Sequence, residues 1–281
     1  MFISFEEIDR YIKEDVPYID LTSMCLDIKS SEGMITYFTR EDIVVCGTEE
    51  VRQIFECFNI KTDIFVSSGQ KVSAGGELIS GKGQGGDINM AWKVGQNIIE
   101  YCSGIATKTQ KMVSAVRDTG SNIPVLTTRK IFPGTKPLAI KAVMAGGAVP
   151  HRLGLSETVL IFKQHIDFIG GFEALLKKMP ELKVSCCEKK IIIETNDFDE
   201  ADKLCKAGAD GIQFDKKTAS ELADMVAELK KNHRGVIFLA AGGINETNAE
   251  SYVKANVDGI VTTSLYSANP ADIGVKIKPN E

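Results

Sequence analysis

Charged side chains end or follow several stretches of this sequence that resemble buried strands. Arg129 and Lys130 follow one such stretch, and Glu194 and Asp215 end two others. Arginine and lysine suit ligands with carboxylate or phosphate oxygens. A pair of carboxylates suits Mg²⁺, which takes one or two protein carboxylates and completes its coordination with substrate oxygens. If the strands end at one mouth, these residues indicate a phosphorylated anionic ligand held together with a metal.

Further residues at strand ends fit the same ligand. His151, which is cationic when protonated, and Arg152 follow Pro150. Gly242-Gly243 and Thr262-Thr263 can offer backbone N–H and hydroxyl groups to a phosphate. Taken singly, a strand-end charge is often only solvated, and a glycine pair is more often a turn. The functional interpretation therefore depends on the convergence of these residues.

The elements that must position these residues alternate from Asn122 onward. Continuous apolar strands that alternate with amphipathic helices indicate a parallel sheet covered by helices. Six or seven strands are recognisable, which predicts an incomplete (β/α) barrel with its chemistry at the carboxyl ends of the strands. The strand candidates are residues 124–129, 157–162, 190–194, 210–215, 236–242 and 258–264, and the helix candidates are 172–179, 198–208, 218–231 and 248–256.

A faint internal repeat supports the barrel. The run Lys206-Ala-Gly-Ala-Asp-Gly-Ile recurs as Lys254-Ala-Asn-Val-Asp-Gly-Ile, each time between a helix and a strand. Recurrence of one unit favours a barrel over a dinucleotide-binding sheet, and no GxGxxG follows a strand.

The first third of the chain has a different pattern. We expect a short helix from Phe5, a strand at Val44-Val45, an amphipathic helix over 48–58 and a helical run over 90–116 that joins two domains near 103–107. The glycine-dense residues 67–88 predict turns between short strands rather than a phosphate loop. They lack GxxxxGK[ST], and we expect no buried strand to lead directly into a helix there. Between Lys130 and Pro150 we expect a glycine-rich loop.

Composition excludes several classes of protein. The 281 residues include 33 Lys and Arg against 38 Asp and Glu, a net charge of −5, which argues against a general nucleic-acid binder. No apolar run approaches the ~20 residues of a membrane span, and the acidic N-terminus does not resemble a secretion signal. The seven cysteines contain no CxxC pair, which predicts reduced thiols in a cytoplasmic protein. Three histidines are too few for a histidine-built zinc site.

Four motifs carry a resemblance that covers nearly the whole chain. The sequence resembles the quinolinate (nicotinate-nucleotide) phosphoribosyltransferase family, and within it the ModD pyrophosphorylase branch that is associated with molybdenum-transport operons. The motifs are SGIAT at 103–107, TTRKIFPGTKPLAIKAVMAGGAVPHRLGLSETVLIF at 127–162, AGADGIQFD at 207–215 and AAGGIN at 240–245.

This resemblance implies the fold, the assembly and the reaction. The implied fold is an N-terminal α/β sandwich domain (1–105) and a partial, seven-stranded (β/α) barrel (106–268), with the C-terminal tail (269–281) packing back on the first domain. The implied assembly is a homodimer, or a higher homo-oligomer, in which the partner's N-terminal domain completes each active site. The implied reaction uses phosphoribosyl pyrophosphate (PRPP) and Mg²⁺, and a nitrogen of the acceptor displaces pyrophosphate at C1 of the ribose. The implied partners are small-molecule substrates, with no nucleic acid and no membrane.

The resemblance also assigns roles to individual residues. Glu194 and Asp215 match carboxylates that face the ribose and the metal, and Lys130 matches a lysine near both substrates. Acceptor binding is assigned to Arg129, His151 and Arg152, and phosphate binding to Gly242, Gly243, Thr262 and Thr263. Lys93 aligns with an arginine that the partner subunit contributes.

The departures from the family pattern concern the acceptor. The family's substrate-binding lysine falls on Phe162, and Lys163 comes one residue later, on the other face of a strand. Losing the partner of a bound carboxylate costs on the order of several kcal/mol. We therefore expect an acceptor that is flatter and less anionic than quinolinate and that stacks on Phe162.

Two alternatives remain. One is a true quinolinate phosphoribosyltransferase of NAD biosynthesis with a repositioned lysine. The other is a non-catalytic ligand-binding barrel in molybdenum homeostasis, which is favoured by Ala241 and Thr263 where the family has a serine and a glycine.

Overall fold

The chain forms two compact units in the computed structural model, which describes residues 1–280. Unit 1 comprises residues 1–110, residues 131–147 and the C-terminal residues from Tyr266, and unit 2 comprises residues 111–130 and 148–265. Residues 131–147, which the expected division assigned to the barrel domain, pack in unit 1. The predicted class, an α/β sandwich domain with a partial seven-stranded barrel, is confirmed.

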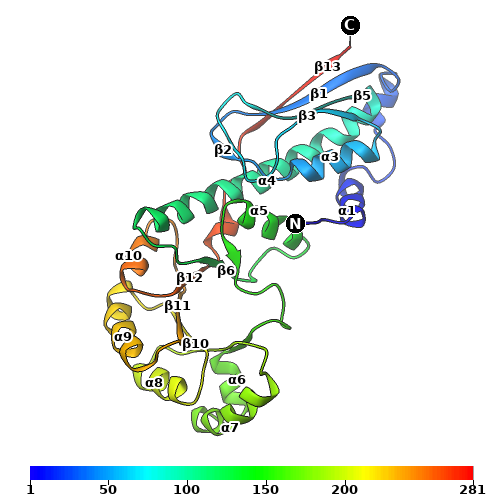
Figure 1. The fold of residues 1–281 in the computed structure, drawn as a ribbon. Coiled ribbons are helices and arrows are strands. Elements are labelled where there is room, and N and C mark those ends of the chain that lie inside the picture. Colours follow the sequence, from blue (N-terminus) through cyan, green and yellow to red (C-terminus); the bar gives the residue numbers. More distant parts are fainter. Residues whose placement is uncertain (281) are drawn as a thin grey trace. The chain divides into compact units, whose positions relative to one another are not determined.

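An antiparallel sheet with the strand order β13-β1-β5-β3 is the centre of unit 1 (Figure 1). The C-terminal strand pairs with β1 from Gly33, opposite Pro279, to Thr39, opposite Ile273. The strands are β1 (Glu32–Thr39), β3 (Lys61–Phe65), β5 (Glu77–Gln84) and β13 (Ile273–Pro279), with a separate pair β2 (Ile43–Val44) and β4 (Lys71–Val72). The helices are α1 (Phe5–Asp15), α2 (Leu21–Cys25), α3 (Thr48–Cys57), α4 (Gly85–Asp118) and α5 (Lys136–Ala145).

Helices α3 and α4 lie along one face of this sheet (Figure 1). The fully buried Tyr37 of β1 donates a hydrogen bond to the carbonyl of Trp92 in α4 over 2.9 Å, and its ring centroid lies 6.2 Å from that of Phe55 in α3. The close approach of α4 to Tyr37 requires a glycine at position 95, because a Cβ there would lie 2.6 Å from the Tyr37 hydroxyl.

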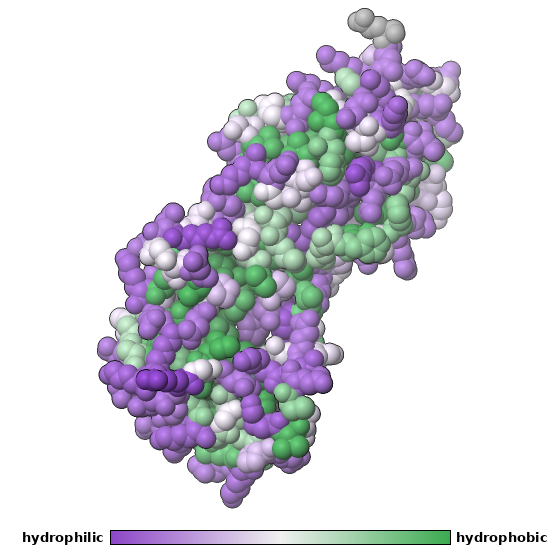
Figure 2. All heavy atoms as spheres, viewed as in Figure 1, coloured by the Kyte–Doolittle hydropathy of each residue, from purple (hydrophilic) through white to green (hydrophobic). Residues whose placement is uncertain are grey.

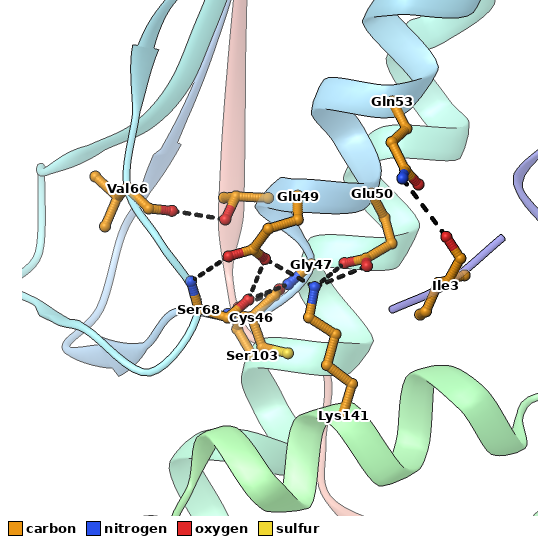
Figure 3. A network of polar contacts seen from close by, with 11 residues as sticks. Ile3, Cys46, Gly47, Glu49, Glu50, Gln53, Val66, Ser68, Ser103 and Lys141 are labelled. Atoms are coloured by element: carbon orange, nitrogen blue, oxygen red, sulfur yellow. Dashed lines mark hydrogen bonds and ion pairs between the residues drawn. The ribbon is translucent and has the colours of Figure 1, made fainter. Parts of the chain in front are cut away.

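An ion-paired network is buried beside α5 in unit 1 (Figure 3). Nζ of Lys141 lies 2.6 Å from Oε2 of Glu50 and 2.8 Å from Oε2 of Glu49. The Lys141 and Glu50 side chains are only 7% and 3% exposed, so neither charge has access to bulk water. Ser68 donates hydrogen bonds from its N–H and its hydroxyl to Glu49.

Two expectations for the first half of the chain are wrong. Strand β5, with four buried residues, runs directly into α4, although we expected no buried strand before a helix there. Residues 136–145 form α5 instead of a loop, because helix-forming residues stand between the breakers Gly134 and Gly146-Gly147. The expected helical run is one helix of 34 residues that connects the two units, and the boundary between the units falls inside it, after Gln110.

Seven parallel strands form the sheet of unit 2, in the order β7-β6-β12-β11-β10-β9-β8. The two edge strands, β7 and β8, each have a single neighbour within the described residues, so the barrel is open. In sheet order the strands are β7 (Val149–Pro150), β6 (Val125–Thr127), β12 (Gly259–Thr262), β11 (Ile237–Ala241), β10 (Gly211–Asp215), β9 (Ile191–Glu194) and β8 (Val159–Ile161).

Amphipathic helices cover the outside of this sheet. Figure 2 shows hydrophilic residues over the outer faces of α8 and α9 and hydrophobic residues over the strands. Side-chain caps begin two of the helices, since Asp197 accepts from the N–H of Glu200 and Thr218 from that of Glu221. The helices are α6 (Lys163–Phe168), α7 (Phe172–Ser185), α8 (Phe198–Lys206), α9 (Ala219–Asn232) and α10 (Ala249–Lys254), followed by the 3₁₀ turn η1 (Ser264–Ser267).

The internal repeat has a structural cause. Asp210 accepts a hydrogen bond from the N–H of Ile191, and Asp258 accepts one from the N–H of Phe238, both over 2.8 Å. Each aspartate thus fixes the start of a neighbouring strand. The position two residues earlier, Gly208 or Asn256, has a left-handed φ where the preceding helix ends.

Helices long and apolar enough to cross a membrane are absent from residues 1–280.

Candidate active site

The carboxyl ends of the parallel strands of unit 2 surround a pocket of about 680 Å³. Of the thirteen residues that the sequence singled out, eleven line this pocket. They are Arg129, Lys130, His151, Arg152, Phe162, Glu194, Asp215, Gly242, Gly243, Thr262 and Thr263.

The other two are placed elsewhere. Lys163 is the first residue of α6, its side chain is 81% exposed, and Nζ lies 2.7 Å from Oδ1 of Asp167. Lys93 belongs to unit 1, where Nζ lies 3.1 Å from Oε1 of Gln96 and 4.6 Å from the centroid of the Trp92 ring.

Glu194 ends β9 and is half-buried at the pocket. Nε2 of Gln213, its register partner on β10, donates to Oε2 of Glu194 over 2.8 Å. Burial raises the pKa of Glu194, and the charge of Asp215 raises it further. The hydrogen bond from Gln213 and the charges of Lys130 and Lys216 act in the opposite direction.

Asp215 ends β10, and its N–H donates to Oδ1 of Asn196 over 2.9 Å. The backbone of Gly242 passes so close that a Cβ there would lie 2.5 Å from Oδ1 of Asp215. Gly242 also has a left-handed φ of +83°, so a glycine is needed at this position for two reasons.

The cations of the pocket that the sequence predicted are Arg129, Lys130 and Arg152. Within residues 1–280, Arg129 and Arg152 form no ion pair with a carboxylate. Burial lowers the pKa of Arg152, and the charge of Arg129 lowers it further, as expected for two guanidinium groups held near each other without an anion between them. Such an arrangement is suited to a bound anion.

The surroundings of His151 oppose its protonation. Burial lowers its pKa, and the charge of Arg152 lowers it further, so both effects favour the neutral imidazole. A neutral imidazole can donate one hydrogen bond and accept another at this pocket.

The two threonines differ in what their hydroxyls can do. The Thr262 hydroxyl donates to the carbonyl of Ile244 over 2.6 Å, so its proton holds the loop after β11 instead of a ligand. Oγ1 of Thr263 lies 2.8 Å from Oγ1 of Thr128, and either can be the donor.

A metal fits this donor set only together with a substrate. Residues 1–280 contain no group of three or more His, Cys, Asp or Glu side chains placed to bind a metal. Glu194 and Asp215 both line the pocket, and two carboxylates completed by substrate oxygens are what Mg²⁺ accepts.

Two residues that sequence reasoning missed also line the pocket. Gln213 stands inside an apolar strand, and a polar residue at that point was the available signal. Lys216 directly follows Asp215, one residue beyond the predicted strand end.

Comparison with known proteins gives the class. The model of the quinolinate phosphoribosyl transferase C-terminal domain matches residues 105–276, and the model of the N-terminal domain matches residues 20–103. The chain is 38% identical over 238 residues to a protein of Rhodobacter capsulatus named pyrophosphorylase ModD, covering 85% of this chain and 91% of that protein. It is 29% identical over 277 residues to a protein of Methanothermobacter thermautotrophicus named as a carboxylating nicotinate-nucleotide pyrophosphorylase, covering 96% and 98%.

A solved structure agrees with these relatives. The crystal structure of nicotinate-nucleotide pyrophosphorylase from Ehrlichia chaffeensis superimposes with a TM-score of 0.90 at 26% identity, covering 99% of this chain and 100% of that one. The chain belongs to the quinolinate phosphoribosyl transferase family. The predicted family and the predicted enzyme class, a phosphoribosyltransferase, are confirmed.

Proposed function

We propose that the chain transfers the phosphoribosyl group of PRPP to a ring nitrogen of an anionic aromatic acceptor and releases pyrophosphate. The observation that carries this proposal is the meeting of two unpaired guanidinium groups, Arg129 and Arg152, with the carboxylates of Glu194 and Asp215 at one pocket. The names of the relatives, which are pyrophosphorylases, support it.

The residues of the pocket suit a displacement at C1 of the ribose. The lone pair of the acceptor nitrogen forms the new bond to C1, the C1–O bond breaks, and pyrophosphate leaves with the electron pair. Glu194 and Asp215 stabilise the positive charge that develops at the ribose, and Lys130 offsets the negative charge of the departing pyrophosphate. No side-chain nucleophile is required, because fixed charges and positioning supply the catalysis.

We also propose that the reaction uses Mg²⁺ and that Glu194 and Asp215 hold this ion. Held there together with substrate oxygens, the metal would supply positive charge that offsets the negative charge of the pyrophosphate. The hydrogen bond from Gln213 helps to keep Glu194 ionised for this purpose.

The acceptor in this proposal is aromatic and carries fewer carboxylates than quinolinate. Arg129 and Arg152 bind one carboxylate as a pair. Phe162 lines the same pocket and offers a ring for stacking in place of a third cation. His165 fixes its backbone, since Nδ1 of His165 accepts a hydrogen bond from the N–H of Phe162 over 3.0 Å.

The test measures pyrophosphate release from PRPP and Mg²⁺ with a panel of acceptors that includes quinolinate and pyridine monocarboxylates. We expect a monocarboxylate to exceed quinolinate. Glu194→Ala and Asp215→Ala should abolish release without changing the circular dichroism spectrum. Arg129→Ala should weaken acceptor binding far more than donor binding in calorimetry.

The same assay separates the alternatives. Quinolinate as the best acceptor would indicate the enzyme of NAD biosynthesis, which the names of several relatives favour. A donor that binds and is never consumed would indicate a binding protein without turnover. Full activity in both alanine variants would remove the catalytic assignment.

We further propose a cytoplasmic homodimer in which Lys93 of the partner subunit completes each site. All seven cysteines are free thiols, which supports a reducing compartment. Mixing inactive Lys93→Ala and Asp215→Ala proteins under conditions that exchange subunits should restore activity, because one site of each mixed dimer is intact. Failure to restore activity in mixed dimers would reject the shared site.

A further inference from the structure

Lys216 has a backbone conformation that its residue type disfavours. Its φ is +60°, in the left-handed region. Four non-glycine residues among 1–280 have such a φ, and the other three are aspartate or asparagine, which tolerate it best. A lysine at this position therefore destabilises the fold relative to glycine or asparagine, and a bare turn would not need it.

The surrounding structure holds this strained residue in place. The N–H of Lys216 donates to the carbonyl of Ala241, at the end of β11, over 2.8 Å. A Cβ on Gly242 would lie 2.6 Å from N and 2.7 Å from Cγ of Lys216. The backbone and the first part of the lysine side chain therefore lie directly against Gly242.

The ammonium group of Lys216 has no partner within residues 1–280, whereas that of the next residue does. Nζ of Lys217 lies 3.4 Å from Oε1 of Glu221. Lys216 lines the pocket, and its charge is near enough to Glu194 to act on that carboxylate. The left-handed backbone thus directs an unpaired cation to the pocket.

Unused backbone donors lie beside this lysine. Gly242 and Gly243 have φ values of +83° and +73°, and across the described residues their N–H groups donate to no protein acceptor. Successive free N–H groups in a turn can form a concave site for an anion. The carboxylate of Asp215 is also close to Gly242, so an anion at this place needs a nearby cation to offset that charge.

We infer that Lys216 is a phosphate-binding residue whose ammonium group pairs with the 5′-phosphate of the phosphoribosyl donor at Gly242-Gly243. This inference rests on the proposed function, because it takes the donor to be PRPP. It explains why the chain keeps a lysine where glycine or asparagine would be more stable.

Three substitutions separate binding from folding. Lys216→Gly and Lys216→Asn remove the cation and relieve the backbone, so both should raise the midpoint of thermal unfolding above that of the wild type. Both should also weaken the binding of PRPP and of ribose 5-phosphate by roughly ten- to a hundredfold in calorimetry. Lys216→Arg keeps the charge and should bind ribose 5-phosphate within a few-fold of the wild type. Lys217→Asn is the matched control and should leave binding unchanged.

The outcomes are distinguishable. If the wild type binds ribose 5-phosphate and Lys216→Asn binds it equally well, the role of Lys216 is overturned. The proposed function would then remain intact. Weaker binding of inorganic pyrophosphate with unchanged binding of ribose 5-phosphate would overturn the assignment to the 5′-phosphate. A wild-type protein that binds neither PRPP nor ribose 5-phosphate would reject the proposed function, and this inference with it.

Discussion

Gln213 donates a hydrogen bond to the carboxylate of Glu194 from the neighbouring strand, with 2.8 Å between Nε2 and Oε2. Gln213 is only 5% exposed, and its Oε1 has no hydrogen-bond partner among the described residues. Since a carboxylate only accepts, the amide NH₂ must face Glu194, which leaves Oε1 directed elsewhere. A buried, half-satisfied amide is costly, which suggests that this position serves the site more than the fold.

Gln213→Met should therefore impair catalysis through Glu194. Without the donated hydrogen bond, the pKa of Glu194, already raised by burial, rises further. The acid limb of the kcat profile should move to higher pH, and kcat at its plateau should fall by about tenfold while KM changes little. The volume-conserving Leu239→Met, on the facing position of β11, is the control and should leave the acid limb in place. An unchanged limb in Gln213→Met would show that this hydrogen bond does not tune Glu194.

Phe162→Lys should raise the use of quinolinate. The lysine returns a cation to a pocket that already contains Arg129 and Arg152, so the second carboxylate gains a partner. We expect kcat/KM for quinolinate to increase by about tenfold or more. Phe162→Leu removes the ring without adding charge, and it should weaken the natural acceptor without any gain for quinolinate. No gain in the lysine variant would mean that other departures from the family pattern control acceptor choice.

Gly242→Ala should destabilise the protein more than Gly243→Ala. Both alanines would have a left-handed φ, which costs roughly 1–2 kcal/mol. Only the Cβ at position 242 meets other atoms, Oδ1 of Asp215 and N of Lys216, whereas a Cβ at position 243 meets nothing within 4 Å. The clash should add about 1–3 kcal/mol, measured as the difference between the two urea-unfolding free energies. Equal losses would show that the loop can move away from Asp215.

Lys141→Met should strongly destabilise unit 1. The substitution leaves Glu50, 3% exposed, and Glu49 without their cation, and an unpaired buried charge costs about 3–5 kcal/mol. Urea unfolding measures the loss. Adding Glu50→Gln to Lys141→Met should recover a large part of it, because the stranded charge is gone. A single variant as stable as the wild type would contradict a buried ion pair.

Lowering the pH should remove the contribution of Glu49 to the stability of the fold within a defined pH range. Burial alone would raise its pKa, but hydrogen bonds from Lys141 and Ser68 lower the pKa from 4.5 to about 2. A carboxylate with a lowered pKa contributes stability above its unfolded-state pKa and loses it as the pH falls. Unfolding free energies measured between pH 5 and 2 should therefore fall more steeply for the wild type than for Glu49→Gln. Glu188→Gln, a surface change, should follow the wild-type curve, and parallel curves for all three proteins would rule out this role.

The sequence predicted the elements of unit 2 well because apolar runs such as Ile191–Glu194 alternate with amphipathic helices. Strand β7 consists of only Val149 and Pro150, too short for any periodicity, and helix α5 was hidden between glycines that we interpreted as loop. The strand is too short, and the helix too close to glycines, for the sequence pattern to predict either element.

The candidate site could be found because parallel strands bring their carboxyl ends to one edge, whatever lies between them along the chain. That rule applies only up to the last residue of a strand, so it identified Asp215 and missed Lys216. The pairing of Lys141 with Glu50 spans 91 residues and follows no strand-end rule. Nothing in either local sequence predicts it.

The interleaved order of the two units limits how this chain can be divided. A fragment ending at residue 105 would lack β13, leaving one side of β1 without its hydrogen-bonded neighbour, and would lack Lys141, leaving Glu50 charged in an apolar interior. The complementary fragment would carry α5 and β13 without the surfaces against which they pack. Truncation of the gene at residue 105 should therefore not give a soluble fragment. A protein split there would regain its native state only if α5 and β13 packed again on the first fragment.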